Sequence, residues 1–167
     1  MTRQQYEALS APFREEGRKR ILLGANRGVT WLCYAAYPVL LIALALLRDQ
    51  RFFWALGVPA VSFVLLSLVR SKLNFPRPYQ VLDITPLIHK ETRGKSMPSR
   101  HVFSIFVIAM TFLWVLPWAG VVLLILGALL GLVRVVGGVH FPRDVLVGAA
   151  CGVGCGLVGY WGLAPLF

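Results

Sequence analysis

Uncharged apolar stretches separated by short polar segments fill most of this chain. Residues 28–47 form 20 consecutive positions without a charged side chain, about the length at which a helix crosses the hydrocarbon core of a bilayer. Similar uncharged stretches cover residues 52–69, 102–118 and 145–167, and the region from 118 to about 139 is apolar with a single charge, Arg134. This pattern predicts an all-α polytopic membrane helix bundle with about five transmembrane helices.

The first 27 residues are polar and basic instead. Apolar side chains recur among them at helical spacing, and Pro12 suits the first turn of a helix capped by Ser10. We interpret residues 1–27 as a basic amphipathic helix that lies on the membrane surface. A disordered basic tail is the alternative.

Residues 28–167 are expected to form the membrane-embedded domain. Its one long polar connection is the loop at residues 70–101, where four prolines exclude a continuous helix. The last apolar stretch carries Gly148, Gly152 and Gly156 at intervals of four residues. Small residues in this register predict a helix face that packs closely against another helix.

Five spans place the N-terminal segment, the 70–101 loop and residues 140–144 on one side of the membrane. Most basic residues outside the spans lie on this side, whereas the opposite side carries only Arg48 and Arg51. Because cytoplasmic loops are enriched in Lys and Arg, we expect a multi-pass cell-membrane protein with this side in the cytoplasm.

The amino-acid composition is typical of a membrane protein, and the net charge is strongly positive. The chain is 57% hydrophobic and 14% charged, against about 45–50% and about 25% in soluble domains. The formal net charge of +10 fits topology signals, contact with anionic lipid, or an anionic substrate. The bilayer and an anionic lipid phosphate are therefore the expected partners, nucleic acid is not expected, and the oligomeric state stays open.

Three polar clusters on this side of the membrane carry the candidate chemistry. The first begins where the second apolar stretch ends, and the third lies at the end of the fourth stretch. The second directly precedes the third stretch, so a helix that starts there directs its N–H groups into the loop as an anion site. The clusters are Arg70, Lys72 and Arg77; Ser99, Arg100 and His101; and Arg134, His140 and Asp144.

These residue types favour phosphoryl transfer. A charge inside an apolar stretch is costly, which makes Arg134 a functional candidate. His140 with Asp144 nearby is a candidate nucleophile or base with its orienting partner. Arginines bind phosphate, and two histidines can supply the nucleophile and the acid that the reaction needs. Because few carboxylates accompany them, we predict hydrolysis of a phosphate ester with no metal and no cofactor.

Together the clusters resemble the signature of the type 2 phosphatidic acid phosphatase family, which also includes soluble bacterial acid phosphatases and vanadate haloperoxidases. The family pattern is K-x6-R-P, then P-S-G-H, then S-R-x5-H-x3-D. Arg77-Pro78, Pro98-Ser99-x-His101 and Arg134-x5-His140-x3-Asp144 match it in order, between residues 70 and 144.

The resemblance implies a role for each matching residue. His140 matches the nucleophile that forms a phosphohistidine, and Asp144 matches the carboxylate that orients and stabilises that imidazole. His101 matches the acid that protonates the leaving oxygen and then helps to activate water. The family is metal-independent. The residues that match phosphate ligands are Arg77, Ser99 and Arg134.

The chain departs from the family pattern at several positions. Arg70 occupies the Lys position, with Lys72 as the alternative, and both are candidate phosphate ligands. Arg100 replaces the Gly of P-S-G-H and brings a further cation toward the phosphate or head group, whereas Val133 replaces the Ser before Arg134. Membrane members usually have six spans, and here the basic N-terminal segment stands in place of the first.

We interpret the chain as an integral-membrane lipid phosphate phosphatase. Its candidate substrates are phosphatidic acid, phosphatidylglycerophosphate and polyprenyl phosphate or diphosphate. Two alternatives stay open. A phosphotransferase would pass the same phosphoryl group to a lipid or sugar hydroxyl, and a non-catalytic protein would bind or transport a lipid phosphate.

The charge distribution generates a prediction of topology. A single cysteine introduced into the N-terminal segment should react with a membrane-impermeant thiol reagent only after the cytoplasmic side is opened, because the basic side stays inside. Labelling of intact cells at that position would contradict the cytoplasmic assignment.

Overall fold

The computed structural model describes residues 1–166, and this part of the chain is helical without a strand, which confirms the predicted all-α class. The helices are α1 (Arg3–Ser10), η1 (Ala11–Phe13), α2 (Glu16–Leu46), α3 (Arg51–Leu73), α4 (Pro78–Val81), α5 (Arg100–Val115), α6 (Pro117–Val136), α7 (Pro142–Gly156), η2 (Leu157–Leu163) and η3 (Ala164–Leu166).

Four helical stretches are long and apolar enough to cross a membrane: α2, α3, α6, and α7 with its continuation to Leu166. The last residue of the predicted fifth stretch, 167, lies outside the described residues. Large apolar side chains cover the outside of the bundle, and Trp31, Leu46 and Phe53 are each more than 65% exposed. Such an exterior suits hydrocarbon rather than water.

Helix α5 forms the centre of the bundle. At 16 residues it is shorter than the four spanning helices, and it contacts α2, α3, α6 and α7. Phe103 and Ala109 are fully buried, and most of its other side chains are buried as well. Enclosure by four neighbours explains why α5 is apolar on every face.

The predicted glycine face of α7 lies against α5 within the same chain. A Cβ atom at Gly148 would lie 2.8 Å from the Ser99 carbonyl oxygen, and one at Gly152 would lie 2.8 Å from the Phe103 carbonyl oxygen. At Gly156 it would meet the Met110 Cβ at 2.4 Å. The absence of side chains at these positions therefore lets the two helix backbones approach closely.

The N-terminal segment is helical, but its boundaries differ from those predicted. Helix α1 begins after Thr2, whose hydroxyl accepts a hydrogen bond from the Gln5 N–H at 3.3 Å. Ser10 occupies the N-cap position of the short turn η1, with Pro12 in its first turn, as predicted, but the Ser10 hydroxyl donates to the Glu7 carbonyl oxygen and does not cap the turn. Residue 27 is no helix boundary, because α2 starts at Glu16 and passes through it.

Packing explains why α2 extends through the polar segment. Leu22 is 3% exposed and joins Leu87, Ile88 and Val139 in a small apolar cluster at this end of the bundle. Tyr6 of α1 is fully buried over Gly138, whose φ of +76° is a conformation that favours glycine. The N-terminal segment therefore packs onto the protein itself.

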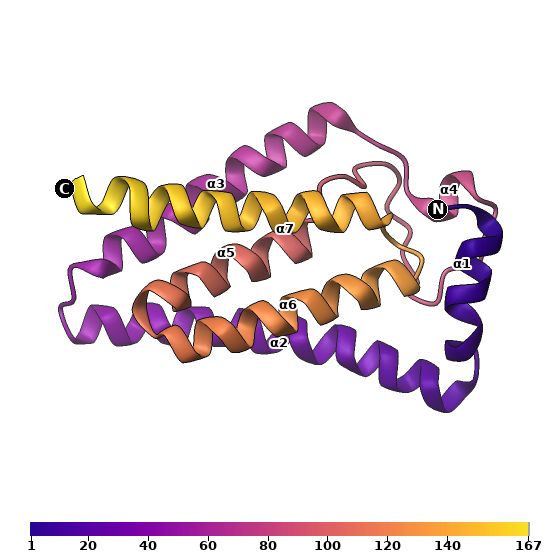
Figure 1. Ribbon diagram of the computed structural model, residues 1–167, viewed down its shortest axis with the longest axis horizontal. Coiled ribbons are helices and arrows are strands. Elements are labelled where there is room, and N and C mark those ends of the chain that lie inside the picture. The colour runs from indigo at the N-terminus through magenta and orange to yellow at the C-terminus, as the bar shows by residue number, and fades with distance from the viewer. Residues whose placement is uncertain (167) are drawn as a thin grey trace.

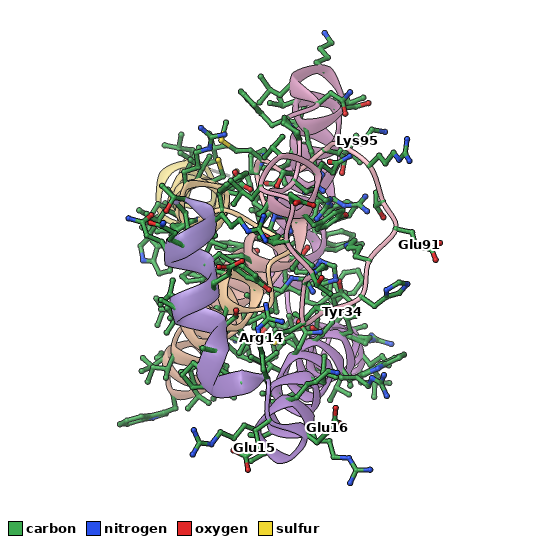
Figure 2. The ribbon with its side chains drawn as sticks, turned by 90° about the vertical axis from the view of Figure 1, so that its right-hand side faces the viewer. Arg14, Glu15, Glu16, Tyr34, Glu91 and Lys95 are labelled. Carbon is green, nitrogen blue, oxygen red and sulfur yellow. The ribbon has the colours of Figure 1, made fainter. Side chains whose placement is uncertain are left out.

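Figure 1 shows α1, the loop between α3 and α5, and the α6–α7 connection at one end of the bundle. The C-terminus and the α2–α3 and α5–α6 connections lie at the other end. The three candidate clusters therefore share one end, as the spans predicted. Figure 2 looks onto that end, where Glu91 and Lys95 project from the loop and Glu15 and Glu16 from the start of α2.

The glycine face generates a prediction of stability. Gly152→Ala should lower the free energy of unfolding by roughly 1–3 kcal/mol, because the added methyl group overpacks the contact with α5. Gly154 lies on the same helix with nothing within 4 Å of its Cβ position, so Gly154→Ala should leave stability unchanged or raise it. Thermal unfolding in detergent tests the pair, and equal melting temperatures would contradict the prediction.

Candidate active site

A cavity of about 470 Å³ opens between the end of α3, the loop, the start of α5 and the α6–α7 connection. Cations and histidines dominate its walls, and the described lining residues include no carboxylate. Such a cavity attracts an anion. Its charged and titratable lining residues are Arg70, Arg77, Lys90, Lys95, Arg100, His101 and His140.

Arg70 lies in the last turn of α3, is 6% exposed and lines the cavity. Its Nη1 donates a hydrogen bond to the Pro98 carbonyl oxygen in the loop. Lys72 is exposed and does not line the cavity. Of the two candidates for the Lys position of the motif, the structure therefore brings only Arg70 to the cavity.

Arg77 links the loop to the α6–α7 connection. It is 1% exposed, and its Nη1 donates to the Val139 carbonyl oxygen at 3.0 Å. Its Nε donates to Gly94 at 3.1 Å, and its Nη2 donates to Lys95 at 3.4 Å, in both cases to the carbonyl oxygen. These bonds hold the guanidinium fixed before an anion arrives.

The start of α5 forms a second wall. Ser99 occupies the N-cap position, but its buried hydroxyl has no partner among the described residues and does not cap the helix. The Ser99 N–H instead donates to the Asp144 carbonyl oxygen at 2.9 Å. Arg100 lines the cavity and lies over the Phe63 ring, with its Cζ 5.8 Å from the ring centroid.

His140 and Asp144 lie together in the α6–α7 connection and the first turn of α7. Their side chains are 1% and 0% exposed, with 3.7 Å between His140 Nδ1 and Asp144 Oδ2. The Ser96 hydroxyl donates to Asp144 Oδ2 and lies 3.4 Å from His140 Nδ1. The Phe141 N–H also donates to Asp144 Oδ2, at 2.9 Å.

The electrostatics favour a neutral His140. Burial, assisted by the charges of Arg134 and Arg77, lowers the pKa of His140 to about 4, although Asp144 opposes the shift. The ring is therefore neutral at pH 7 and keeps a lone pair on one nitrogen. Its buried Nε2 has no hydrogen-bond partner among the described residues.

Arg134 lies behind the cavity wall. Its side chain is 3% exposed and does not line the cavity. The Nη2 atom is 3.2 Å from His101 Nδ1, and Nη1 donates to Asn26 Oδ1 at 3.0 Å. Because arginine only donates, His101 Nδ1 accepts this bond, and its Nε2 carries the proton.

Sequence reasoning missed three residues at this site. Ser96 contacts Asp144, Asn26 contacts Arg134, and Lys90 lines the cavity. None of them lies in the motif pattern. The one available signal was Ser96 itself, because it lies two residues before the P-S-x-H cluster and therefore near the same helix start.

Within the described chain, no group of three His, Cys, Asp or Glu side chains lies close enough to hold a metal ion. The cations that surround the cavity instead offer fixed positive charge. Guanidinium groups can take over the neutralisation of phosphate oxygens that a metal ion provides in other phosphoryl-transfer sites.

Comparison with solved structures gives the class of fold. The chain is similar to LpxE of Aquifex aeolicus, with a TM-score of 0.72, 25% sequence identity, and coverage of 93% of this chain and 92% of that one. It also resembles a transmembrane PAP2 type phosphatidylglycerolphosphate phosphatase from Bacillus subtilis, with a TM-score of 0.61, 21% identity and 93% and 90% coverage. The chain therefore has the fold of a membrane lipid phosphatase.

The family follows from the sequence itself. The family model described as the PAP2 superfamily matches residues 51–166, which is more than half of the chain. No curated protein matches the sequence. The chain belongs to the PAP2 superfamily, as the resemblance of its three motifs predicted.

Lys90 generates a prediction of pH dependence. Burial, together with the charges of Arg134, Arg77 and Arg70, lowers the pKa of Lys90 to about 8. Lys90 is therefore charged below this pH and loses its charge as the pH rises through it. Binding of inorganic phosphate, measured by titration calorimetry, should weaken roughly tenfold above pH 8, the worth of one charge-assisted hydrogen bond.

Lys90→Arg should abolish this loss, because a guanidinium keeps its charge. Lys95 also lines the cavity but is exposed, so Lys95→Arg serves as the matched control and should keep the loss. An unchanged alkaline decrease in the Lys90→Arg variant would contradict the prediction.

Proposed function

We propose that this protein hydrolyses the phosphate of a membrane lipid through a phosphohistidine on His140. One observation carries the proposal: a buried, neutral imidazole whose Nε2 has no partner among the described residues lines a cavity walled by cations, with a carboxylate 3.7 Å from its other nitrogen. A nucleophile with an orienting carboxylate beside an anion site is the arrangement that phosphoryl transfer requires.

The cavity walls would bind the phosphate before reaction. Arg70, Arg77 and Arg100 can each donate to its oxygens, and Lys90 adds a further charge. The first N–H groups of α5 would complete the set. The Ser99 hydroxyl is fully buried and does not line the cavity, so it would act from behind the wall. Arg134 would act from behind the wall through its contact with His101.

In the first step, the lone pair of His140 Nε2 attacks phosphorus, and the bond from phosphorus to the lipid oxygen breaks. His101 donates a proton to this oxygen, so the lipid leaves as an alcohol. The bound phosphate offsets the cations around His101 and so favours the protonated ring that an acid needs. This ring carries a proton on both nitrogens, so the hydrogen bond from Arg134 to Nδ1 is broken in this state and forms again when His101 has given up its proton. Asp144 stabilises the positive charge that develops on the ring of His140.

In the second step, water attacks the phosphohistidine. His101, now neutral, takes a proton from this water, the phosphorus–nitrogen bond breaks, and its electron pair returns to His140 Nε2. Inorganic phosphate leaves, and both histidines regain their starting states. A lipid or sugar hydroxyl in place of water would make the same site a phosphotransferase.

Two apolar cavities beside α3 support a lipid substrate. One of about 350 Å³ lies among α2, α3 and α5 and is lined by Tyr34, Phe63 and Ile108 among others. The other, of about 550 Å³, lies between α3 and the end of α7. Phe63 also contacts Arg100 at the phosphate cavity, so an acyl chain beside α3 can extend from a phosphate held there.

The basic side of the bundle favours substrates from the inner leaflet. If this side faces the cytoplasm, as the charge distribution indicates, lipids made there are the natural substrates. Phosphatidylglycerophosphate and phosphatidic acid are then favoured over a polyprenyl carrier that is recycled outside.

His140→Ala should lower kcat/KM for a lipid phosphate by a factor on the order of 10⁴ or more, because the nucleophile is lost. His89 is an exposed loop histidine, so His89→Ala is the matched control and should retain activity. Phosphate release from a panel of lipid phosphates in mixed micelles measures both variants. Equal activity of His140→Ala and the parent would reject the phosphohistidine.

The same assay tests the metal-independent mechanism. Vanadate should inhibit, because it mimics five-coordinate phosphorus, and EDTA should leave activity unchanged. Loss of activity with EDTA that a divalent ion restores would overturn the metal-free reaction. An added acceptor alcohol that diverts phosphate from water would identify a phosphotransferase.

A further inference from the structure

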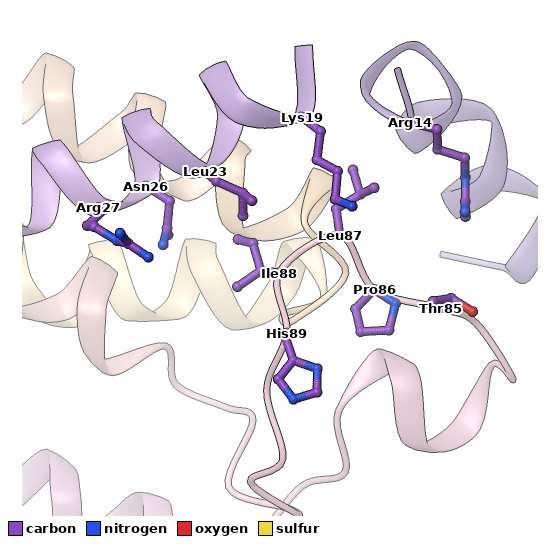
Figure 3. Close-up of a pocket in the computed structure, with 10 residues that line it drawn as sticks. All are labelled: Arg14, Lys19, Leu23, Asn26, Arg27, Thr85, Pro86, Leu87, Ile88 and His89. Atoms are coloured by element: carbon purple, nitrogen blue, oxygen red, sulfur yellow. The ribbon is translucent and has the colours of Figure 1, made fainter. Parts of the chain in front are cut away.

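A second cavity, of about 660 Å³, lies between the first turns of α2 and residues 85–89 of the loop (Figure 3). It shares no lining residue with the phosphate cavity among the residues that the structure describes. No motif of the superfamily falls on its walls. The proposed phosphatase reaction therefore does not use it.

The charge of this second cavity is positive. Its charged lining residues among those described are Arg14, Lys19 and Arg27, and none of the lining residues is acidic. Lys19 has an exposed partner, Glu16, at 3.6 Å, but Glu16 does not line the cavity. Three cations around a concave surface suit a phosphate group.

The remaining walls are apolar. Figure 3 shows Leu23 on α2 facing Ile88 on the loop, with Lys19 and Arg27 on the same side of the helix. Leu87 and Ile88 are less than 10% exposed and fix this part of the loop, and the Ile88 N–H donates to the Gly137 carbonyl oxygen at 3.1 Å. A ligand that combines a phosphate with apolar groups fits both kinds of wall.

The position of the second cavity at the membrane interface favours a lipid over a soluble ligand. Helix α2 passes from its polar first turns into an uncharged stretch at residue 28, so the cavity lies where this helix enters the bilayer. Basic residues at this level attract anionic lipids by about 1 kcal/mol each. The head group of an anionic phospholipid is thus present at the cavity in high local concentration.

Two contacts join this cavity to the phosphate cavity. Asn26 lines the second cavity, and its Oδ1 accepts from Arg134, which in turn donates to His101 Nδ1. The second link is the backbone, because residues 85–89 line one cavity and the next residue, Lys90, lines the other. A ligand that fixes Asn26 and this wall also fixes Arg134 and Lys90.

From this geometry we infer that the second cavity binds the phosphate of an anionic phospholipid that is not the substrate, and that its binding increases activity at the phosphate cavity. The effect on rate rests on the proposed function, whereas the binding of the phospholipid does not depend on it. Fixing side chains in advance removes an ordering cost from substrate binding, so the bound lipid should lower KM more than it changes kcat.

The test uses the full chain in phosphatidylcholine vesicles with or without phosphatidylserine, whose phosphate is a diester and is neither a candidate substrate nor a product. Phosphatidylserine should lower KM for a lipid phosphate severalfold in the parent. Lys19→Gln/Arg27→Gln should lose this response and keep the activity measured in phosphatidylcholine alone. Arg18→Gln/Arg20→Gln removes the same charge from exposed positions of α2 outside the cavity, and it should respond like the parent.

Binding is measured separately, as phosphatidylserine retained by the purified protein in native mass spectrometry. Retention should fall roughly thirtyfold in Lys19→Gln/Arg27→Gln, from the loss of two cations near the head group, and stay unchanged in Arg18→Gln/Arg20→Gln. Because this readout needs no catalysis, an inactive parent that still shows this difference would reject the proposed phosphatase function and not the site.

Two outcomes would overturn the inference. Equal retention and equal response in the two double variants would show that the cavity is not the site. Equal activation by water-soluble glycerophosphoserine would assign the cavity to a free anion and reject a membrane lipid as its ligand.

Discussion

The hydrogen bonds of Asp144 hold three separate parts of the chain in one place. Its carboxylate accepts from Ser96 in the loop and from the Phe141 N–H, and its backbone carbonyl accepts from Ser99 at the start of α5. It is fully buried, with His140 beside it. A buried carboxylate is stable only when hydrogen bonds or an opposite charge offset its desolvation. Here Oδ2 accepts two hydrogen bonds, and Oδ1 lies 3.7 Å from Arg143 Nε. These contacts fix the relative positions of the loop, α5 and α7, and with them the positions of the two histidines.

The cations around the cavity show the complementary constraint. Arg70 and Arg77 are buried with little negative charge nearby, which is costly. Carbonyl oxygens of the loop and of Val139 accept their N–H groups and offset part of this cost. The side chains are thus held apart against their mutual repulsion before any anion binds. A site organised in this way stabilises charge without reorganising during the reaction.

Periodicity and motif spacing predicted much of this arrangement because both are local properties of the sequence. The apolar stretches predicted the membrane spans. Counting these spans predicted that the three clusters lie at the same end of the bundle, where Arg70, His101 and His140 line one cavity. The misses involve contacts across long distances in sequence. Asn26 reaches Arg134 only through the packing of α2 on α6, and the extension of α2 through residue 27 depends on apolar contacts with the loop. Local sequence patterns predict neither of these long-range contacts.

The length of α5 has a consequence for the bilayer. Helices α5 and α6 are joined by a single residue, Leu116, and α5 is 16 residues long against 20 for α6. At about 1.5 Å per residue, the first residue of α5 lies roughly 6 Å short of the far end of α6. Under the proposed function, and with the end of α6 at the head-group plane, a lipid phosphate reaches the start of α5 only by moving below that plane. The thickness and fluidity of the surrounding membrane then become variables of the reaction rate, alongside the chemistry of the head group.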